Sequence, residues 1–420
     1  MQNLKKLNFK NINPELCNKC GTCVGICPVE ALNTNNEEIL FDNDKCISCS
    51  QCYNNCPGIE FNYPQMNKLV FGDNSIVNKK IGCYSSLYLV QSKQLGTRNG
   101  ASSGGAITTI LSKAFKKKLI DGAIVVSMSE SKPWMCTATI VDNLSDINHA
   151  KGSKYTLISL NSILKKTRQF KKIAFVGLPC HIHGIRKLQK NKHKNVSNIK
   201  YILGLFCGFN VSNNATKFLI RKQGIKFKDI LSIEYRGGKW PGGFLIKTKN
   251  PKISKTHFLP KYYYDIVDTM FVPKRCLICI DYMAEFSDIS FGDIWLDELN
   301  REPWGTMIIR TERGKTLLEL VKNSINLKQL PLEKLINSHE HNIKHKKIGA
   351  FMRMDEYNQK PIYGISPLKH TNAEGRRIKL ESFIFKIATS KTFHMFAELI
   401  PLSIMGLAAK LRRKLLKKTI

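Results

Sequence analysis

Two cysteine-rich runs near the start of the chain restrict its fold and chemistry more than any other feature. Residues 17–28 read CNKCGTCVGICP and residues 46–57 read CISCSQCYNNCP, so both follow the spacing C-x2-C-x2-C-x3-C-P. Zinc sites usually combine C-x2-C pairs that are separated by longer spans. Four closely spaced cysteines followed by a proline instead match the thiolate ligands of 4Fe-4S clusters.

The two runs predict a small domain that holds two clusters. In two-cluster ferredoxins the fourth cysteine of each run binds the other cluster. One cluster is therefore expected on Cys17, Cys20, Cys23 and Cys56, and the other on Cys46, Cys49, Cys52 and Cys27. Such a domain passes single electrons and has no substrate site of its own, so any further chemistry must come from the remaining chain.

The composition indicates a globular, cytoplasmic protein. Hydrophobic residues make up 43% of the 420, and no window is apolar for the ~18 residues that a membrane-spanning helix needs. The start of the chain lacks the apolar stretch of a secretory signal, so the fourteen cysteines are expected to bind metal rather than form disulfides. The formal charge of +34 is spread along the chain without a nucleic-acid-binding signature. It favours an acidic redox partner or an anionic membrane surface over nucleic acid.

The middle of the chain has the pattern of an α/β core. Small residues at 100–105 precede a helical stretch, and apolar runs at 123–128, 173–177 and 201–207 resemble buried strands. Strands that alternate with helices predict a sheet whose site lies at the carboxyl ends of the strands. The small-residue loop fits either a phosphate site at a helix N-terminus or an ordinary turn.

Four further cysteines leave two interpretations open. Cys180 and Cys207 follow predicted strands, and Cys276 and Cys279 form a C-x2-C pair. They either bind a third 4Fe-4S cluster together or serve as small apolar side chains in the core. Cys83 and Cys136 have no such company and are expected to be structural.

Seven ordered segments resemble the beta subunits of coenzyme F420-reducing hydrogenase and formate dehydrogenase, which are related to plant 7-hydroxymethyl chlorophyll a reductase. These segments are SSGGAITTIL, KGSKYT, GLPCHIHGIRKL, LGLFC, YRGGKWPGG, CLICIDYMAEFSDISFGD and GTMIIRT, all within about residues 83–330. The resemblance implies an FAD-binding core with a nearby 4Fe-4S cluster. It also implies that Cys180, Cys207, Cys276 and Cys279 are the ligands of that cluster.

The same resemblance places FAD against two loops. Their residues are Ser102, Ser103, Gly104 and Gly105, and Gly152, Ser153, Lys154 and Tyr155. Small residues let the backbone approach a pyrophosphate, and Lys154 would neutralise it. A substrate is expected over the flavin ring, near Arg236, Gly237, Trp240 and Pro241 or near Asp288 and Asp293. Either aspartate would be a proton donor if buried, but the catalytic residues are not identified.

The expected fold is an α+β ferredoxin-like two-cluster domain, followed by an α/β flavin-binding core and a helical basic C-terminal tail. The expected boundaries are 1–65 for the ferredoxin domain, 66–82 for a linker, 83–175 and 176–330 for the N- and C-terminal parts of the core, and 331–420 for the tail.

Two stretches of the tail carry separate expectations. The segment HEHNIKHKK, with His339, His341 and His345, is interpreted as a solvated basic stretch rather than a metal site. Near the end, Ile404, Leu407, Leu411 and Leu415 recur at helical spacing among lysines and arginines. This pattern fits a helix on the anionic inner face of the membrane, or one packed on the protein with its basic face in solvent.

Together these features predict an iron–sulfur flavoprotein oxidoreductase. It would relay electrons through 4Fe-4S clusters between a redox partner, FAD and a small-molecule substrate. The alternative is a ferredoxin-type electron-transfer module that docks to a partner enzyme, for example in surface-polysaccharide biosynthesis. The sequence does not identify the substrate, the electron donor or the use of coenzyme F420.

Overall fold

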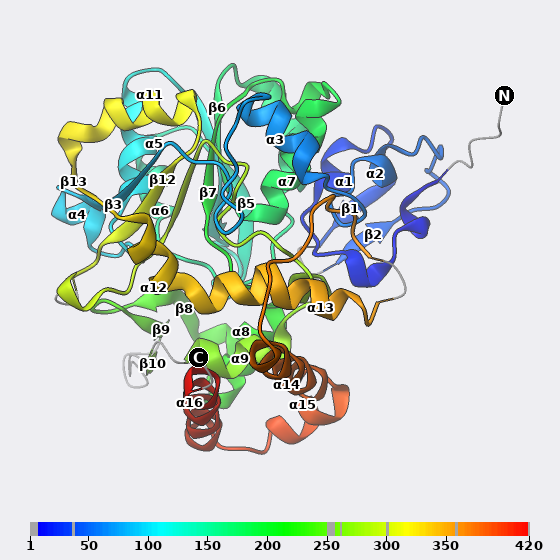
Figure 1. Ribbon diagram of the computed structural model, residues 1–420, viewed down its shortest axis with the longest axis vertical. Helices are drawn as coiled ribbons and strands as arrows, with labels where there is room; N and C mark the ends of the chain where they lie inside the picture. Colours follow the sequence, from blue (N-terminus) through cyan, green and yellow to red (C-terminus); the bar gives the residue numbers. More distant parts are fainter. Residues whose placement is uncertain are drawn as a thin grey trace.

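A mixed eight-stranded sheet forms the centre of the protein (Figure 1). The computed structural model describes residues 7–35, 38–249, 257–260, 263–299, 302–357 and 360–418. The strand order of the large sheet is β13-β3-β12-β11-β7-β6-β4-β5. Its strands are β3 (Ser86–Ser92), β4 (Gly122–Met128), β5 (Cys136–Val141), β6 (Ile173–Gly177), β7 (Ile199–Leu205), β11 (Ile289–Asp293), β12 (Gly305–Ile309) and β13 (Ile325–Gln329).

The α/β pattern is confirmed in the middle of this sheet and differs at its edges. The neighbours β4, β6, β7 and β11 run parallel, whereas β5, β12, β3 and β13 add on antiparallel. The predicted strands at 123–128 and 173–177 coincide with β4 and β6. The sheet joins strands from both expected parts of the core.

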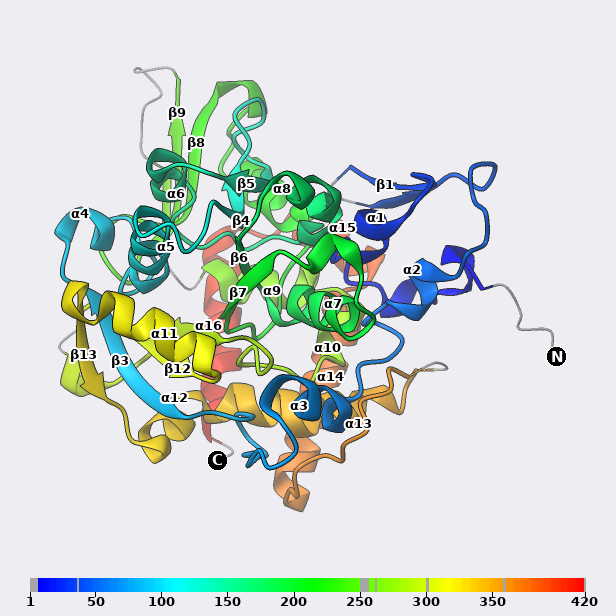
Figure 2. The same ribbon diagram turned by 90° about the horizontal axis from the view of Figure 1, so that it is seen from above.

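Helices cover both faces of the sheet. On one face, α5 (Ala106–Lys116) and α11 (Glu312–Val321) pack over β3, β4 and β12 through one apolar cluster. On the other face, α7 (Pro179–Lys190) packs over β6 and β7. Figure 2 shows α7 between the sheet and the N-terminal part of the chain.

The remaining elements surround this centre. They are α4 (Leu95–Arg98), α6 (Leu144–His149), α8 (Asn213–Lys222), α9 (Tyr263–Phe271) and α10 (Lys274–Leu277), and an antiparallel sheet of β8 (Ile230–Gly237), β9 (Gly243–Thr248) and β10 (His257–Pro260). A run of 3₁₀ turns spans Leu160–Gln169.

The N-terminal cysteine domain is small and lies against α7 (Figures 1 and 2). Its elements are α1 (Thr22–Ile26), α2 (Gln51–Asn54), β1 (Leu32–Thr34) and β2 (Ile39–Phe41). Residues 66–82 were expected to form a linker, but α3 (Tyr63–Phe71) extends into this segment. Asn62 caps this helix, and its residues Tyr63 and Met66 are buried in the main core, which overrides the weak periodicity of the segment.

The C-terminal part is folded against the core (Figure 1). Its elements are α12 (Leu332–Lys344), a π-helix at His345–Gly349, α13 (Ala350–Met354), α14 (Asn372–Ala388), α15 (Lys391–Ala397) and α16 (Leu402–Lys418). None of the helices described in the structure is both long enough and apolar enough to cross a membrane.

The expectation that HEHNIKHKK is solvated is wrong for most of its basic residues, although His341 is exposed. His339, His345, Lys346 and Lys347 are all at most 4% exposed. Their partners lie inside the fold: His345 binds the Glu381 carboxylate (2.9 Å), and Lys347 pairs with Glu285. Because these partners lie far away in the sequence, composition alone could not reveal that the stretch is buried.

Candidate electron-transfer site

The first group of four cysteines lines one cavity of the N-terminal domain. Cys17, Cys20, Cys23 and Cys56 all border it. Three of them come from the first run, at the entrance of α1, and the fourth from the second run after α2. This is the grouping that the crossed ligand pattern of two-cluster ferredoxins predicts.

The second group lines a separate cavity closer to solvent. Cys27, Cys46, Cys49 and Cys52 border it, and the side chain of Cys49 is exposed. The two cavities thus divide the eight cysteines of the runs as the sequence predicts. Cys49 places one edge of this group at the surface of the domain.

The third group is assembled from three distant segments. Cys180 is the second residue of α7, Cys207 follows β7, and Cys276 and Cys279 lie in and after α10. Burial raises the pKa of the Cys180 thiol, and the charges of Cys20, Cys207, Cys276 and Cys279 raise it further. Cys180 therefore lies within electrostatic reach of the other three and of Cys20 in the first group.

Each of these groups supplies four thiols, the number of ligands that a 4Fe-4S cluster takes. Among the described residues, no three His, Cys, Asp or Glu side chains lie close enough to hold one metal ion. In a cubane each thiolate binds a different iron, so the ligand sulfurs stand farther apart. Burial raises the pKa of Cys20 and of Cys207 to about 12. Thiolates at these positions therefore need a cationic metal centre to compensate their charge.

The N-terminal domain is held against the core by buried polar contacts. The Lys187 ammonium on α7 donates to the carbonyls of Cys56 (3.1 Å) and Glu60 (3.0 Å). The Asn161 amide donates to the hydroxyl of Thr22 (2.9 Å) and to the carbonyl of His181 (2.9 Å). Helix α7 therefore carries Cys180 in its first turn and, through Lys187, binds the backbone beside the first cysteine group.

Buried cations lie beside the third group, where no local sequence pattern indicated them. The Lys346 ammonium, 1% exposed, donates to the carbonyl of Cys276 (3.1 Å). Its charge opposes the effect of burial on the pKa of both Cys207 and Cys276. Arg275 donates to the Tyr363 hydroxyl (2.7 Å) and to the carbonyl of Pro57 (3.4 Å). The only hint of Lys346 in the sequence is the run KHKK, which looked like a solvated surface.

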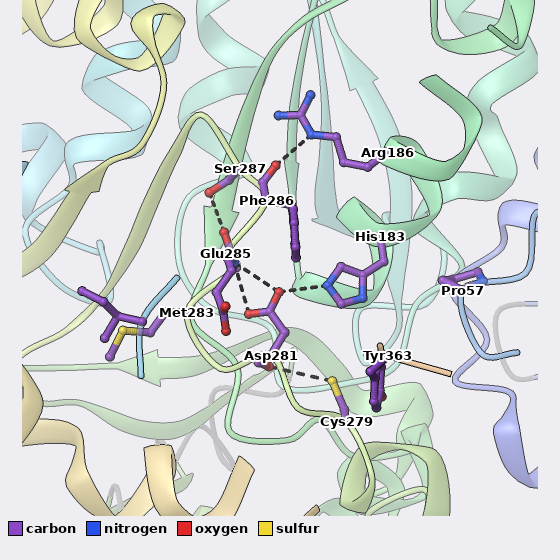
Figure 3. A network of polar contacts seen from close by, with 12 residues as sticks. Pro57, His183, Arg186, Cys279, Asp281, Met283, Glu285, Phe286, Ser287 and Tyr363 are labelled. Carbon is purple, nitrogen blue, oxygen red and sulfur yellow. Dashed lines mark hydrogen bonds and ion pairs between the residues drawn. The ribbon is translucent and has the colours of Figure 1, made fainter. Parts of the chain in front are cut away.

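A buried carboxylate network lies next to Cys279 (Figure 3). The Asp281 carboxylate binds the His183 ring (2.9 Å) and accepts from the Glu285 amide (3.1 Å). Burial would raise the pKa of Asp281, but the hydrogen bond and charge of His183 hold it below the ordinary value. Burial raises the pKa of Glu285 to about 7, although Lys347 opposes this shift. The network fixes the loop that follows the cysteine pair.

The two loops expected to bind FAD lie side by side. The amide of Ser153 donates to the hydroxyl of Ser102 (2.6 Å), and the backbone of Gly152 faces Gly100. Ser103 lies beside Gly305 at the start of β12, and Gly104 lies so close to Val90 that a Cβ has no room there. The structure thus joins segments that are about fifty residues apart.

Lys154 does not have the free ammonium that the proposed contact with a pyrophosphate requires. Its Nζ donates to the carbonyls of Ala150 (2.5 Å) and Lys151 (3.0 Å) at the end of α6. Burial lowers the pKa of Lys154 to about 8. The side chain therefore caps a helix end, and a phosphate could reach it only by displacing these bonds.

The predicted substrate residues separate into two sets. Arg236 pairs with Asp293 (2.5 Å) near Tyr155, and Trp240 stacks on Trp295 with 5.1 Å between ring centroids. Asp288 lies elsewhere and is 1% exposed.

The surroundings of Asp288 favour a structural role over that of a proton donor. Its carboxylate accepts from the amide of Ile202 (2.7 Å) and from the hydroxyl of Thr311 (2.8 Å). These bonds join β7 to the start of α11, so Asp288 stabilises the contact between the two elements.

The two cysteines outside the three groups are Cys83 and Cys136. Both are buried, and the Cys136 thiol contacts the Met128 sulfur (3.6 Å).

Comparisons with known proteins cover both the N-terminal domain and the core. Two family models describe the beta subunit of coenzyme F420 hydrogenase/dehydrogenase: the one for its C terminus matches residues 170–334, and the one for its N-terminal part matches residues 87–165. A 4Fe-4S dicluster domain matches residues 9–57, which confirms an iron–sulfur domain at the start of the chain.

Relatives cover different shares of the chain. The beta subunit of coenzyme F420 hydrogenase from Methanococcus voltae is 30% identical over 229 residues, 52% of this chain and 74% of that protein. A subunit of F(420)H(2) dehydrogenase from Methanosarcina mazei is 25% identical over 335 residues, 76% of this chain and 86% of that protein. Coenzyme F420-dependent sulfite reductase of Methanocaldococcus jannaschii is 27% identical over 339 residues, 77% of this chain. The chain spans only about half of that relative, 48% of its length.

A solved structure shares the fold. A chain of the F420-reducing NiFe hydrogenase complex from Methanosarcina barkeri aligns with a TM-score of 0.55 and 21% identity, covering 69% of this chain and 99% of that one. The family models, the relative from Methanococcus voltae and this fold all agree with the resemblance of the seven sequence segments. The chain belongs to the family of coenzyme F420 hydrogenase/dehydrogenase beta subunits.

Proposed function

We propose that the protein is an iron–sulfur flavoprotein oxidoreductase that carries electrons between a redox partner protein and a small-molecule substrate. The observation that carries this proposal is the continuity of the three cysteine groups. The charge of Cys20 in the first group raises the pKa of Cys180 in the third, and the charge of Cys52 in the second group raises the pKa of Cys23 in the first. Relatives named as hydrogenase and dehydrogenase subunits support a partner protein for this chain as well.

The residues of this chain would hold and tune three 4Fe-4S clusters. The ligands would be Cys17, Cys20, Cys23 and Cys56; Cys27, Cys46, Cys49 and Cys52; and Cys180, Cys207, Cys276 and Cys279. Lys187 and Asn161 fix the first group against the third. Lys346 and Arg275 place positive charge where the third cluster carries its negative charge, which favours the reduced state.

FAD would supply the conversion between one-electron and two-electron chemistry. Its binding site is proposed at the loops of residues 102–105 and 152–155, because the bond from Ser153 to Ser102 brings them together at the start of α5. The helix N-terminus and the small residues suit a pyrophosphate. The nearby Arg236–Asp293 pair would orient a substrate.

Iron and flavin content after anaerobic purification tests the proposal. We expect ~12 irons per chain, four for each cubane, together with bound flavin. The variant Cys180→Ser should lose about four irons, whereas Cys136→Ser, a buried cysteine outside the groups, should lose none. Unchanged iron content in Cys180→Ser would refute the third cluster. Absence of flavin after reconstitution would refute the flavoprotein function.

The second candidate is a ferredoxin-type electron-transfer module that docks to a partner enzyme, for which surface-polysaccharide biosynthesis remains one setting. The exposed edge of the second group at Cys49 favours it, since a protein could exchange electrons there directly. The two candidates differ in one measurement. An oxidoreductase, once reduced, is reoxidised by its small-molecule substrate alone, whereas a module needs the partner. Deazaflavins and nicotinamide nucleotides are the first substrates to try.

A further inference from the structure

The C-terminal helices α14 to α16 expose an unusual amount of apolar surface. Among the described residues, eighteen large hydrophobic side chains are exposed, and nine of these lie between residues 380 and 411. They are Leu380, Phe383, Ile387, Met395, Phe396, Leu399, Ile404, Leu407 and Leu411. Figure 1 shows that the three helices gather at one end of the molecule, away from α5 and α11.

The exposed side chains form stripes opposite the buried faces of their helices. On α14 the buried residues include Ile378, Phe385 and Ala388, while the exposed apolar residues recur at positions 380, 383 and 387. On α16 Met405 and Ala409 are buried, while positions 404, 407 and 411 are exposed. Spacings of three and four residues keep each stripe on one face. Each of these two helices therefore has one apolar face toward the protein and a second apolar face toward solvent.

The charges around the stripes are almost all positive. Lys379, Lys386 and Lys391 are exposed on these helices. The two acidic residues between positions 376 and 420 are engaged elsewhere. Glu381 is buried against His345, and Glu398 pairs with Arg221 of α8 (2.5 Å). The outer face therefore combines apolar side chains with an excess of positive charge.

We propose that the outer face of α14, α15 and α16, defined by the nine apolar residues above, docks on an anionic lipid bilayer. Apolar stripes bordered by lysines are the pattern of helices that lie in a membrane interface. Protein interfaces instead tend to exclude lysine from their core, which disfavours a protein partner or a second copy of the chain. The docking does not depend on the bound clusters or flavin.

The docked face would lie close to the third cysteine group. The inner face of α14 reaches the segment that contains Cys276. Phe385 packs in one apolar cluster with Leu277, and the ring centroids of Phe385 and Phe209 are 5.6 Å apart. One helix, about 10–12 Å across, therefore separates the membrane surface from the residues around Cys276. Docking would therefore bring the third cysteine group close to the membrane surface.

Vesicle sedimentation with the full chain tests the docking. We expect the protein to sediment with vesicles of phosphatidylcholine and phosphatidylglycerol, less at high salt, and far less with phosphatidylcholine alone. The double variant Phe383→Ser/Leu407→Ser removes two side chains that are each 59% exposed. It should weaken partitioning at least about tenfold, from the lost transfer of apolar surface. The matched control is Ile76→Ser/Leu231→Ser, at 90% and 56% exposure on other elements, and it should bind like the wild type.

Two results would overturn the proposal. One is absence of sedimentation with the anionic vesicles. The other is equal sedimentation of the wild type and the Phe383→Ser/Leu407→Ser variant. Light scattering distinguishes a second copy, because a dimer that this variant abolishes, without vesicle binding, would mean that the face is a protein interface. If the variant folds poorly, Lys379→Glu/Lys386→Glu replaces it and must also lose binding to anionic vesicles.

Discussion

Replacement of Gly184 by alanine should disturb the junction between the first and third cysteine groups. Gly184 lies on α7, and a Cβ there would be 2.8 Å from Nδ2 of Asn161 and closer still to Oγ1 of Thr22. Ordinary contacts begin at 3.4 Å, so Asn161 must move about 0.6 Å away from α7 and Thr22 must move farther, or their side chains must rotate. Rotation breaks the bond from Asn161 to Thr22 (2.9 Å).

The expected loss of stability is about 3 kcal/mol. Overpacking costs about 1–3 kcal/mol, and a lost buried hydrogen bond adds about 0.5–1.5 kcal/mol. For a chain of this size, the apparent melting temperature should fall by roughly 3 °C. The electron transfer from the N-terminal domain to the core should also slow, since Thr22 lies between the proposed ligands Cys20 and Cys23.

Gly96→Ala is the matched control, because no atom lies within 4 Å of the Cβ that it adds. Thermal unfolding and stopped-flow reduction of both variants measure the two effects. If Gly184→Ala melts and transfers electrons like Gly96→Ala, the close packing of α7 on the cysteine domain does not hold the groups together.

Three further outcomes follow from the site. Ser102→Ala removes the hydrogen bond that joins the two loops, so the flavin dissociation constant should rise about fivefold in equilibrium dialysis. The control is the surface variant Ser131→Ala, and equal flavin binding by both variants would mean that these loops do not bind the flavin. Lys346→Met removes a buried positive charge beside Cys276, so the third cluster should become harder to reduce in a potentiometric EPR titration, whereas Lys344→Met, whose partners are the surface residues Glu340 and Glu374, should leave its potential unchanged. Burial lowers the pKa of His339 from 6.5 to about 4, so between pH 6.5 and 4 the folded state binds fewer protons than the unfolded chain. The free energy of unfolding should therefore fall by about 3 kcal/mol as the pH drops through this range. His339→Gln should flatten this part of the pH dependence of thermal unfolding, and an unchanged profile would contradict the reasoning.

The local patterns of the sequence predicted the elements that depend on their own residues. The spacing of eight cysteines predicted the division into two cavities, and the apolar runs predicted β4 and β6. The third group depended on the resemblance, because Cys180, Cys207 and the pair at 276–279 meet only after the sheet has formed. Lys346 and Lys347 were misread, since a lysine whose partner is sixty to seventy residues away has no local signal of burial.

The flavin loops show an intermediate case. Small residues at 100–105 predicted a tight turn before α5, and its N-cap Gly105 indeed has a positive φ of 74°. The role of Lys154 could not be predicted, because its ammonium turns back to the carbonyls of Ala150 and Lys151 at the end of the preceding helix. The resemblance implied a phosphate contact for Lys154, whereas unsatisfied helix carbonyls are its partners.

The way α7 is built has a consequence for the timing of electron flow. The helix carries Cys180 in its first turn and holds the carbonyls of Cys56 and Glu60 through Lys187 two turns later. One helix thus carries a ligand candidate of the third group and holds the backbone of the first. A movement of the N-terminal domain that separates the two groups would have to break these bonds. In the proposed electron path, control over the rate would act at the exposed edge near Cys49 or where electrons leave the core.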